Sequence, residues 1–551
     1  MLEKINKKQM LYPGKTLLLI KDDPFSYSHQ NWKLFLEKNC ETLIIFDAAG
    51  ESKKFGKDSM NKKFLKIIKN HLPKRVFLLG GTDELHLETL EKTKNLFPKI
   101  ILFTYFGDDD QFFDNLSKYV ALFVDVCLVS QKKFIKKYQE GGLKNIFYFT
   151  GVNTEFFKQL NLKKKYDVTF IGGPLSNKSG RVEYLEFLMK NKVNLKIFGK
   201  GWEKYSQFKE IYGGTVDCHE MVKIINQSKI SLSFSKNVYG GLHLKARTFE
   251  CGACNSFTLV EKYENYLDLF SKKDLETFTN KKELLNKIKY FLDRPKERNR
   301  ISKKLFDKIS KNYGSKNEVE KIKKSTSINR FEKWSLPNIK KHVIYLSKTD
   351  LEKNYEEIKN KLEKYDYVSF KEEGVINSKH KDLLQIYSLE KSKKEISCCD
   401  YIVYKKNLGD FIRFDSKKGF YDLNYNEFNK FLKKSQLMIA KNFFLKNLLK
   451  FNSKRGLNKN LITEKNTVFI SFPLLKLKNL KLKRYSILKK ACRFYFPQKI
   501  YSLKYQKKLF RTLFLPSLFL EIIRGNFFIL QVVFSSLKKN FCSIKFKKTD
   551  S

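Results

Sequence analysis

The stretch Val238–Glu261, VYGGLHLKARTFECGACNSFTLVE, decides the interpretation of the fold. Glycines make its first part a loop, a helical pattern begins near Lys245, and the apolar run Ser256–Val260 is typical of a strand. A loop, a helix and a strand in this order form one step of an alternating α/β architecture. Basic residues lie at the helix start, where free backbone N–H groups attract phosphate. The stretch therefore predicts an anion-binding helix N-terminus beside a strand.

Three charged residues of this helix form the candidate site. Lys245 and Arg247 lie at or just before the helix start and can make charge-assisted bonds to a diphosphate. Glu250 follows Arg247 by three residues, so the two can share one helical face. Its carboxylate can accept hydrogen bonds from sugar hydroxyls. The alternative interpretation is ordinary solvated charge on a helix surface.

The preceding chain contains further strands that end in glycines. The runs Asp167–Ile171 (DVTFI), Asn194–Phe198 (NLKIF) and Ile230–Phe234 (ISLSF) predict strands, and Val182–Met189 suits a helix. The glycines that end the first two runs are Gly172, Gly173, Gly199 and Gly201. They serve as ordinary turn residues, and they would also let the backbone approach a diphosphate.

The N-terminal part repeats this alternation without repeating its sequence. Five apolar runs predict strands: Thr16–Ile20, Thr42–Phe46, Arg75–Leu79, Ile100–Phe103 and Val126–Val129. The fold class expected is α/β, with two Rossmann-like doubly wound domains facing a cleft, because open parallel sheets bind ligands at their carboxyl ends. The expected divisions are 1–160 (first Rossmann-like domain), 161–325 (second Rossmann-like domain), 335–474 (unassigned α/β region) and 475–551 (basic helical tail). The polar stretch Gly314–Asn329 predicts a domain boundary.

Composition limits the possible classes of protein. The 551 residues include 110 Lys and Arg against 58 Asp and Glu, a net charge of +52, and 42% are hydrophobic. Such a chain can bury real cores, which excludes global disorder, and its charge predicts an anionic partner. Nine irregularly spaced cysteines indicate reduced thiols, and the N-terminus contains no apolar stretch of signal-peptide length, so a cytoplasmic location is expected.

The N-terminal half offers two further candidates. The acidic run Asp108-Asp109-Asp110 follows a predicted strand. Asp108 and Asp109 could contact an acceptor, the run could bind a divalent metal, or it could simply cap a helix; no metal site is expected. His29 follows the first strand, where the cleft should lie, and is a candidate catalytic base, although a lone histidine is more often structural.

Residues Tyr166–Tyr313 resemble the C-terminal half of CgeB-like proteins, within the group 1 glycosyl transferases of the GT-B fold. Five pieces match in order: DVTFIGG with Arg181 at the next helix start, NLKIFGKGW, INQSKISLSFS, LKARTFECGAC and KKELLNKIKYFLDRPKERNRIS. The N-terminal half is similar more loosely, through FTYFGDDDQFFD and YFTGVNTEFF. The resemblance covers roughly residues 1–315.

The resemblance implies sugar transfer from a nucleotide-activated donor without a metal or other cofactor. Donor-binding residues would be Gly172, Gly173, Arg181, Gly199, Gly201 and Glu250, with Lys245 and Arg247 stabilising the leaving diphosphate. A Glu in the position of Glu250 holds the ribose in relatives, and a second Glu eight residues earlier faces the donor sugar. Leu242 occupies that earlier position here. The third region faintly resembles a GT-A-like sugar-transfer module that lacks a clear DxD.

The remaining expectations concern partners. The acceptor would be a cell-surface glycan, a lipid-linked sugar or a protein. The tail 475–551 contains 19 Lys and Arg against two acidic residues, a net of +17, mixed with aromatic residues. It predicts either a packed basic subdomain or peripheral binding to an anionic inner membrane surface. The alternatives in function are an inactive sugar-binding scaffold and a nucleic-acid-binding protein, although no specific nucleic-acid motif is present.

Overall fold

The structure is a computed structural model of the chain. It describes residues 12–21, 23, 25, 29–79, 85–143, 145–237, 240–271, 273–327, 343–347, 349–371, 375–377, 380–405, 409–413, 437–448 and 467–478. The predicted tail 475–551 therefore lies outside the described residues except for its first four positions. Among the described helices, none combines the length and the apolar character that crossing a membrane requires.

The first domain is built on a six-stranded parallel sheet with the order β2-β1-β3-β4-β5-β6. Its strands are β1 (Tyr12–Ile20), β2 (Cys40–Asp47), β3 (Arg75–Leu78), β4 (Ile101–Phe106), β5 (Val126–Val129) and β6 (Ile146–Tyr148). Leu17 and Leu19 pack into one apolar cluster and Leu18 and Ile20 into another. The sheet is thus buried on both faces, which explains why its strands are continuous apolar runs.

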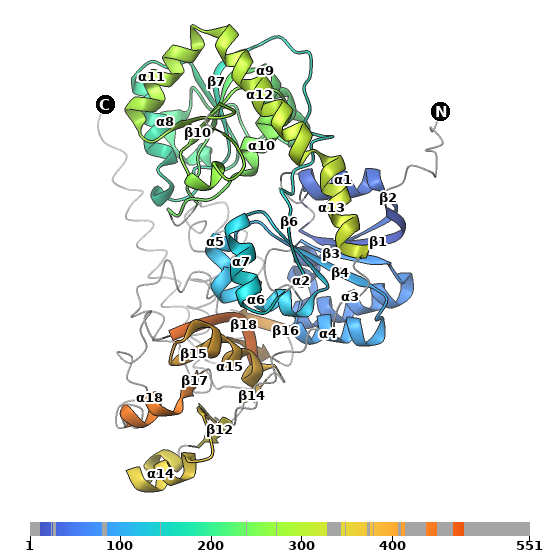
Figure 1. The fold of residues 1–551 in the computed structure, drawn as a ribbon, viewed down its shortest axis with the longest axis vertical. Coiled ribbons are helices and arrows are strands. Elements are labelled where there is room, and N and C mark those ends of the chain that lie inside the picture. The colour runs from blue at the N-terminus through green and yellow to red at the C-terminus, as the bar shows by residue number, and fades with distance from the viewer. Residues whose placement is uncertain are drawn as a thin grey trace, which may run out of the picture. The chain divides into compact units, whose positions relative to one another are not determined.

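Helices connect these strands and cover the sheet (Figure 1). They are η2 (His29–Lys33, a π-helical turn), α1 (Leu34–Asn39), α2 (Ala48–Phe55), α3 (Lys57–His71), α4 (Leu87–Leu96), α5 (Asp109–Phe112), η3 (Phe113–Ser117), α6 (Lys118–Val120), η4 (Ala121–Phe123) and α7 (Lys132–Glu140). In α3, Met60, Phe64 and Ile68 recur every four residues and are buried in the same cluster as Leu17. This spacing places one apolar helix face against the sheet.

The second domain contains a five-stranded parallel sheet with the order β11-β10-β9-β7-β8. Its strands are β7 (Tyr166–Ile171), β8 (Leu195–Phe198), β9 (Ser228–Ser233), β10 (Thr258–Glu261) and β11 (Glu276–Phe278). The strand order reverses between β7 and β9, which is the point where doubly wound sheets bind ligands. Gly172 and Gly173 follow β7 at this point. The expected α/β class, with two Rossmann-like doubly wound domains, is confirmed.

The helices of the second domain are α8 (Arg181–Lys190), α9 (Cys218–Gln227), α10 (Ala246–Ala253), α11 (Lys281–Leu292) and α12 (Pro295–Tyr313), with short 3₁₀ turns η5 (Asn177–Ser179), η6 (Trp202–Lys204), η7 (Ser206–Phe208) and η8 (Glu264–Tyr266). Asp217 and Glu220 form a capping box at the start of α9. Gly252 of α10 faces α12 so closely that an added Cβ would lie 2.3 Å from Ile309 Cδ1. The small residue therefore allows the two helices to pack.

The polar stretch Gly314–Asn329, where a boundary was expected, contains helix α13 (Ser315–Ser327). Val319 and Ile322 are buried in the cluster that contains Trp32 of the first domain. Glu318 is also buried, and its carboxylate accepts hydrogen bonds from the backbone N–H of Thr150, at 2.8 Å, and from its hydroxyl, at 2.9 Å. The chain thus returns from the second domain and packs on the first. Because the stretch is polar overall, the sequence did not single out Val319 and Ile322, the two apolar residues that pack on the first domain.

The third region contains a mixed sheet with the order β12-β13-β17-β15-β18-β14, and β16 pairs with β15. Its elements are β12 (Val343–Leu346), η9 (Asp350–Glu352), α14 (Tyr355–Leu362), β13 (Tyr367–Phe370), β14 (Val375–Asn377), α15 (Lys381–Ser392), β15 (Ile396–Lys405), β16 (Gly409–Arg413), β17 (Leu437–Ala440), α18 (Lys441–Lys446) and β18 (Thr467–Lys478). Leu384 and Tyr387 of α15 join the core of the first domain, and the Tyr387 hydroxyl donates to the carbonyl of Gly141 at 2.9 Å.

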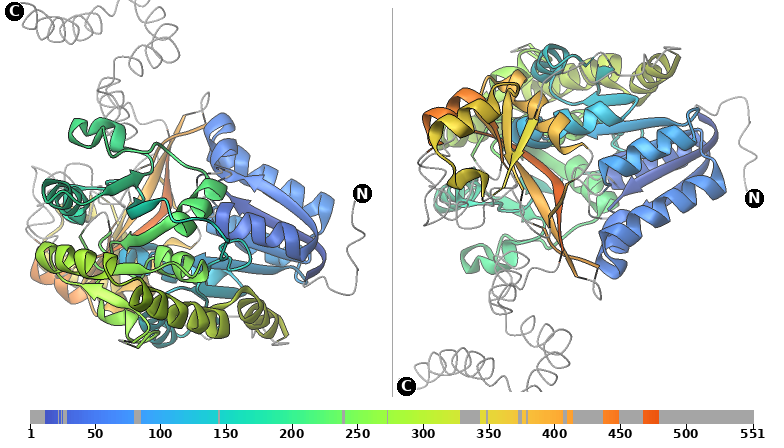
Figure 2. Two further views of the ribbon diagram at one scale, coloured as in Figure 1. Left: turned by 90° about the horizontal axis from the view of Figure 1, so that it is seen from above. Right: turned by 90° about the horizontal axis from the view of Figure 1, so that it is seen from below.

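Figure 2 gives two further views of these elements, with the first sheet in blue. The three sheets occupy residues 12–148, 166–278 and 343–478. The domain limits proposed from the sequence, at 160, 325 and 474, stay predictions.

Candidate functional site

Helix α10 presents the charged residues of the decisive stretch. Lys245 occupies the N-cap position, and its backbone N–H donates to the Tyr266 hydroxyl at 3.0 Å. Arg247 and Glu250 form an ion pair one turn apart, with Nη1 2.8 Å from Oε2. Glu250 is only 3% exposed. A buried carboxylate is therefore held beside the cationic start of a helix, as the sequence predicted for one shared face.

Arg181 brings a third cation to this place. It begins α8, is buried, and donates from Nη1 to the carbonyl of Gly173 at 2.8 Å. Burial lowers its pKa to about 10, which the charge of Glu261 partly opposes. Burial also lowers the pKa of Lys245 to about 8, and the charge of Arg181 lowers it further, whereas Asp108, Asp110 and Glu261 act in the opposite direction. The three cations thus influence one another in a poorly solvated site.

Two guanidinium nitrogens in this cluster lack partners. Nε of Arg181 and Nε of Arg247 are both buried and make no hydrogen bond to the described part of the chain. A buried donor without a partner costs about 1–3 kcal/mol, so such groups call for an explanation. An anion bound between the two domains would supply the missing acceptors.

The glycines that end β7 and β8 lie side by side. Gly199 has φ +124°, and a Cβ added to it would lie 2.8 Å from the backbone of Gly172. The Trp202 indole N–H donates to the carbonyl of Gly172 at 2.6 Å and fixes this contact. Gly201 has φ +107°, where a Cβ would lie 3.1 Å from Pro174. The structure therefore brings Gly172, Gly173, Gly199 and Gly201 together at one end of the second sheet.

The aspartates of the acidic run in the first domain point in different directions. Asp109 is buried, accepts a hydrogen bond from the Tyr138 hydroxyl at 3.0 Å, and has its pKa raised to about 8 by burial. Asp110 instead contacts the second domain. It accepts from Asn237 Nδ2 at 3.0 Å and lies 3.3 Å from His243 Nδ1. Asp108 approaches the same His243 nitrogen at 3.7 Å. Asp108 thus lies at the site, and Asp109 points into the core.

The π-helical turn η2 supplies another contact between the domains. Asn31 donates from Nδ2 to Glu250 Oε1 at 3.2 Å and accepts from the backbone N–H of Asn153 at 2.8 Å. His29, the candidate base, begins the same turn and is partly buried. The sequence analysis missed Asn31, because a single Asn carries no motif.

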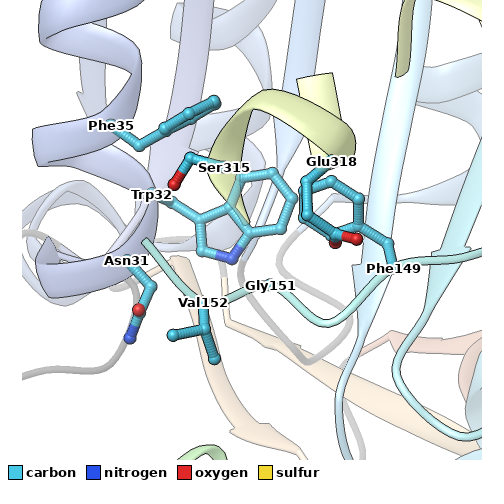
Figure 3. Close-up of a pocket in the computed structure, with 8 residues that line it drawn as sticks. All are labelled: Asn31, Trp32, Phe35, Phe149, Gly151, Val152, Ser315 and Glu318. Carbon is cyan, nitrogen blue, oxygen red and sulfur yellow. The ribbon is translucent and has the colours of Figure 1, made fainter. Parts of the chain in front are cut away.

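A small cavity lies behind this turn, where α13 packs on the first domain. It has a volume of about 10 Å³, enough for about one water molecule. Figure 3 shows Trp32 between Phe35 and Phe149, with Ser315 and Glu318 of α13 beside it. Burial raises the pKa of Glu318, which Lys321 partly opposes. The cavity is too small for a sugar nucleotide and is part of the domain packing.

Metal ligands do not gather in the described part of the chain. No group of three or more His, Cys, Asp or Glu side chains there is arranged to bind a metal ion. Cys251 and Cys254 are buried free thiols, in keeping with a packing role. Burial raises the pKa of both thiols, which suppresses their reactivity.

Comparisons with known proteins match the part of the chain that contains the second domain. Residues 181–324, which contain Arg181 and the whole of α10, match the family described as glycosyl transferase-like. The spore protein CgeB of Bacillus subtilis (strain 168) is 23% identical over 216 residues, which cover 35% of this chain and 65% of that protein. The chain thus matches somewhat less than two thirds of the length of this relative.

Two solved structures are similar to part of this chain. Sucrose-phosphate synthase from Thermosynechococcus elongatus is 9% identical with a TM-score of 0.42, covering 57% of this chain and 98% of that chain. HepE from Anabaena, in complex with UDP and glucose, is 11% identical with a TM-score of 0.42, covering 57% and 99%. Residues 181–324 are thus similar to glycosyl transferase-like proteins, part of the chain is similar to CgeB, and the first two domains each contain a doubly wound parallel sheet.

Proposed function

We propose that the protein transfers a sugar from a nucleotide-sugar donor to a glycan, a lipid-linked sugar or a protein acceptor at the cell surface. The observation that carries this proposal is the cluster of Arg181, Lys245 and Arg247, with two buried guanidinium nitrogens that lack partners. Three cations at the starts of α8 and α10, of which Arg181 and Lys245 are desolvated, suit a nucleoside diphosphate beside the reversal point of a parallel sheet.

Each part of the donor has a candidate partner. The diphosphate would lie against the start of α10 and the glycines that end β7 and β8. Glu250 would accept bonds from the ribose hydroxyls, for which its contact with Asn31 would rearrange. The first domain, through Asp108 and its neighbours, would hold the acceptor. This division follows from which side chains each domain contributes.

The chemistry would be mainly electrostatic. When the bond between the anomeric carbon and the diphosphate breaks, negative charge develops on the leaving oxygen. Cations and helix N–H groups that are already in place stabilise this charge without reorganisation. Lys245 and Arg247 would supply the charge that a divalent cation supplies in other transferases. We therefore propose that neither a metal nor another cofactor is needed.

Thermal-shift measurements test donor binding and metal independence together. UDP-glucose, UDP-N-acetylglucosamine, UDP-galactose and GDP-mannose are added separately, each with and without EDTA. A true ligand at 100 times its Kd stabilises the folded protein by about 2.7 kcal/mol. We expect one donor to raise the Tm equally in both conditions, and Lys303→Ala, on an exposed face of α12, to behave like the wild type. No shift with any donor, or a shift abolished by EDTA, would contradict the proposal.

An inactive sugar-binding scaffold remains the second candidate. Leu242 stands where many relatives have a donor-facing Glu, and its side chain is 37% exposed. A scaffold would bind the donor but not hydrolyse it in the absence of acceptor. A nucleic-acid-binding protein, the third alternative, would bind DNA or RNA with a steep dependence on salt.

We also propose that the enzyme is cytoplasmic and binds the inner membrane surface through residues 475–551. This proposal rests on the charge of +17 in that segment, since each basic residue near an anionic leaflet contributes about 1 kcal/mol. Full-length protein should float with anionic liposomes at low salt, and a chain that ends at residue 474 should not. Equal flotation of both chains, or equal binding to neutral liposomes, would refute the proposal.

A further inference from the structure

A short hairpin-like excursion precedes α10 and reaches the first domain. His243 donates its backbone N–H to the carbonyl of Ser235 at 3.0 Å, and Asn237 donates to the carbonyl of Gly241 at 2.8 Å. Glu261, at the end of β10, holds the base of the excursion by accepting from the N–H groups of Ser235 and Lys236, at 2.9 and 3.2 Å. The backbone on both sides of the excursion is therefore fixed by the second domain.

This excursion places an imidazole against carboxylates of the other domain. His243 is only 7% exposed, and its Nδ1 lies 3.3 Å from Asp110 Oδ2 and 3.7 Å from Asp108 Oδ1, which are ion-pair contacts without hydrogen-bond geometry in the described part of the chain. Asp110 is itself held by Gln131 and Asn237. Burial acts to raise the pKa of Asp110, but its contacts with His243 and Gln131 outweigh this effect and lower the pKa. Within the described residues, Nε2 of His243 has no hydrogen bond.

A carboxylate at Nδ1 sets the imidazole for chemistry at its other nitrogen. The carboxylate favours the tautomer that carries the proton on Nδ1, so that Nε2 keeps its lone pair. It also stabilises the imidazolium that forms when Nε2 accepts a proton. Lys245 follows His243 by two residues, and the charge of Asp110 acts on it. Asp110 therefore links the imidazole to the cations assigned above to the diphosphate, because it contacts His243 and its charge acts on Lys245.

We propose that His243, oriented by Asp110, is the general base that removes the proton from the acceptor hydroxyl. This inference rests on the proposed function, because it needs a nucleotide sugar bound at α10. It also accounts for Leu242: catalysis would depend on the neighbouring histidine and not on a glutamate at that position.

The step balances as a direct displacement. The acceptor oxygen forms a bond to the anomeric carbon while its proton passes to His243 Nε2. The bond from the anomeric carbon to the diphosphate oxygen breaks, and its electron pair leaves with the nucleoside diphosphate next to Lys245 and Arg247. Attack from the face opposite the leaving group inverts the anomeric carbon, so an α-linked donor gives a β product.

The pair also makes the base dependent on domain contact. Asp110 belongs to the first domain and His243 to the second, so the imidazole is oriented only while the two domains touch. The charged groups around it are Asp108 and Asp110 from the first domain, and Lys245 and Glu261 from the second. Hydrolysis of the donor by water would thus be suppressed whenever the domains separate.

Donor hydrolysis followed by proton NMR tests the proposal, using whichever of UDP-glucose, UDP-N-acetylglucosamine, UDP-galactose or GDP-mannose gives the largest thermal shift. These donors are α-linked, so the wild type should release the β-anomer before mutarotation. His243→Gln should lower kcat by about 100- to 10,000-fold, the usual contribution of a general base, and should abolish the acidic limb of the pH profile. Asp110→Asn should lower kcat while the donor-induced thermal shift stays unchanged in both variants.

A control variant distinguishes the loss of a general base from the loss of a contact between the domains. Lys133 donates to the Tyr263 hydroxyl at 2.7 Å, which is another contact between the domains. Lys133→Ala should therefore keep the wild-type kcat and pH profile. Initial release of the α-anomer, wild-type kcat in His243→Gln, or equal losses in His243→Gln and Lys133→Ala would each overturn the inference. A wild type that binds a donor but never hydrolyses it would also overturn it, although donor binding would stand. Failure of every donor to bind would instead refute the proposed function.

Discussion

Lys245→Ala and Arg247→Ala should each lower kcat by about 100-fold or more, with little change in the Tm of the free protein. Loss of one preorganised charge-stabilising group typically costs about 100- to 1000-fold in kcat. Lys245 is at the N-cap of α10, and Arg247 points one guanidinium nitrogen at Glu250 and leaves Nε without a partner. Neither side chain belongs to an apolar core cluster, so the fold should survive. Single-turnover rates with saturating donor measure the effect.

The double variant and the pH dependence sharpen this test. Burial lowers the pKa of Lys245 to about 8, so the side chain is charged below pH 8 and loses its charge above it. Donor affinity of the wild type should therefore fall as the pH rises through 8, whereas Lys245→Ala should lack this fall. Arg300→Ala, on an exposed part of α12, controls for loss of a positive charge far from α10. Wild-type turnover in the double variant would remove both residues from the site.

The sequence predicted the second domain well because its local signals and its burial agree. The runs that end in glycine became β7 and β8, and Lys281–Leu292 became α11 with the predicted limits. Strands buried on both faces are continuous apolar runs, and these are hard to mistake when turn residues follow them. The strand predicted at Ile230–Phe234 is β9, which begins two residues earlier at Ser228.

Two contacts between segments that are far apart in the sequence were not predicted. Helix α13 is polar overall, and only its docking on Trp32 and Tyr12 distinguishes Val319 and Ile322 from linker residues. Likewise, α15 joins the first domain through Tyr387 and Gly141, which are 246 positions apart in sequence. Such pairs leave no local pattern, so the sequence could not show which surface of the first domain they cover.

The candidate site also contains residues with a local sequence pattern and residues whose role depends on long-range contacts. Lys245, Arg247 and Glu250 could be named because motif and helix position coincide in one stretch of chain, and Arg181 because it begins the helix after another matching piece. His243 lies within the decisive stretch, but its interest comes from Asp110, which is supplied by the other domain. Asp109, in contrast, was a candidate from its local sequence, but its side chain does not point to the site. Its neighbours made it an acceptor candidate, yet helix geometry turns its carboxylate toward Tyr138. Direction of a side chain, unlike its presence, depends on the packed structure.

Gly199→Ala should be the most destabilising of the small substitutions considered, and Gly142→Ala is its matched control. Both glycines have positive φ, +124° and +88°. A Cβ at Gly199 would lie 2.8 Å from the Gly172 backbone, whereas a Cβ at Gly142 would meet nothing within 4 Å. Backbone strain costs about 1–3 kcal/mol at either position, and overpacking adds about 1–3 kcal/mol at Gly199 alone.

The backbone around Gly199 has little freedom to relax. Its N–H donates to the carbonyl of Gly214 at 2.9 Å, and Trp202 holds the carbonyl of Gly172 from the other side. At about 2–4 °C per kcal/mol for a domain of this size, Gly199→Ala should lower the Tm by about 5–15 °C and Gly142→Ala by half of that or less. Calorimetry of the full chain measures both. Equal shifts would mean that conformational strain alone requires glycine at 199, and that the two glycine turns are not packed against each other.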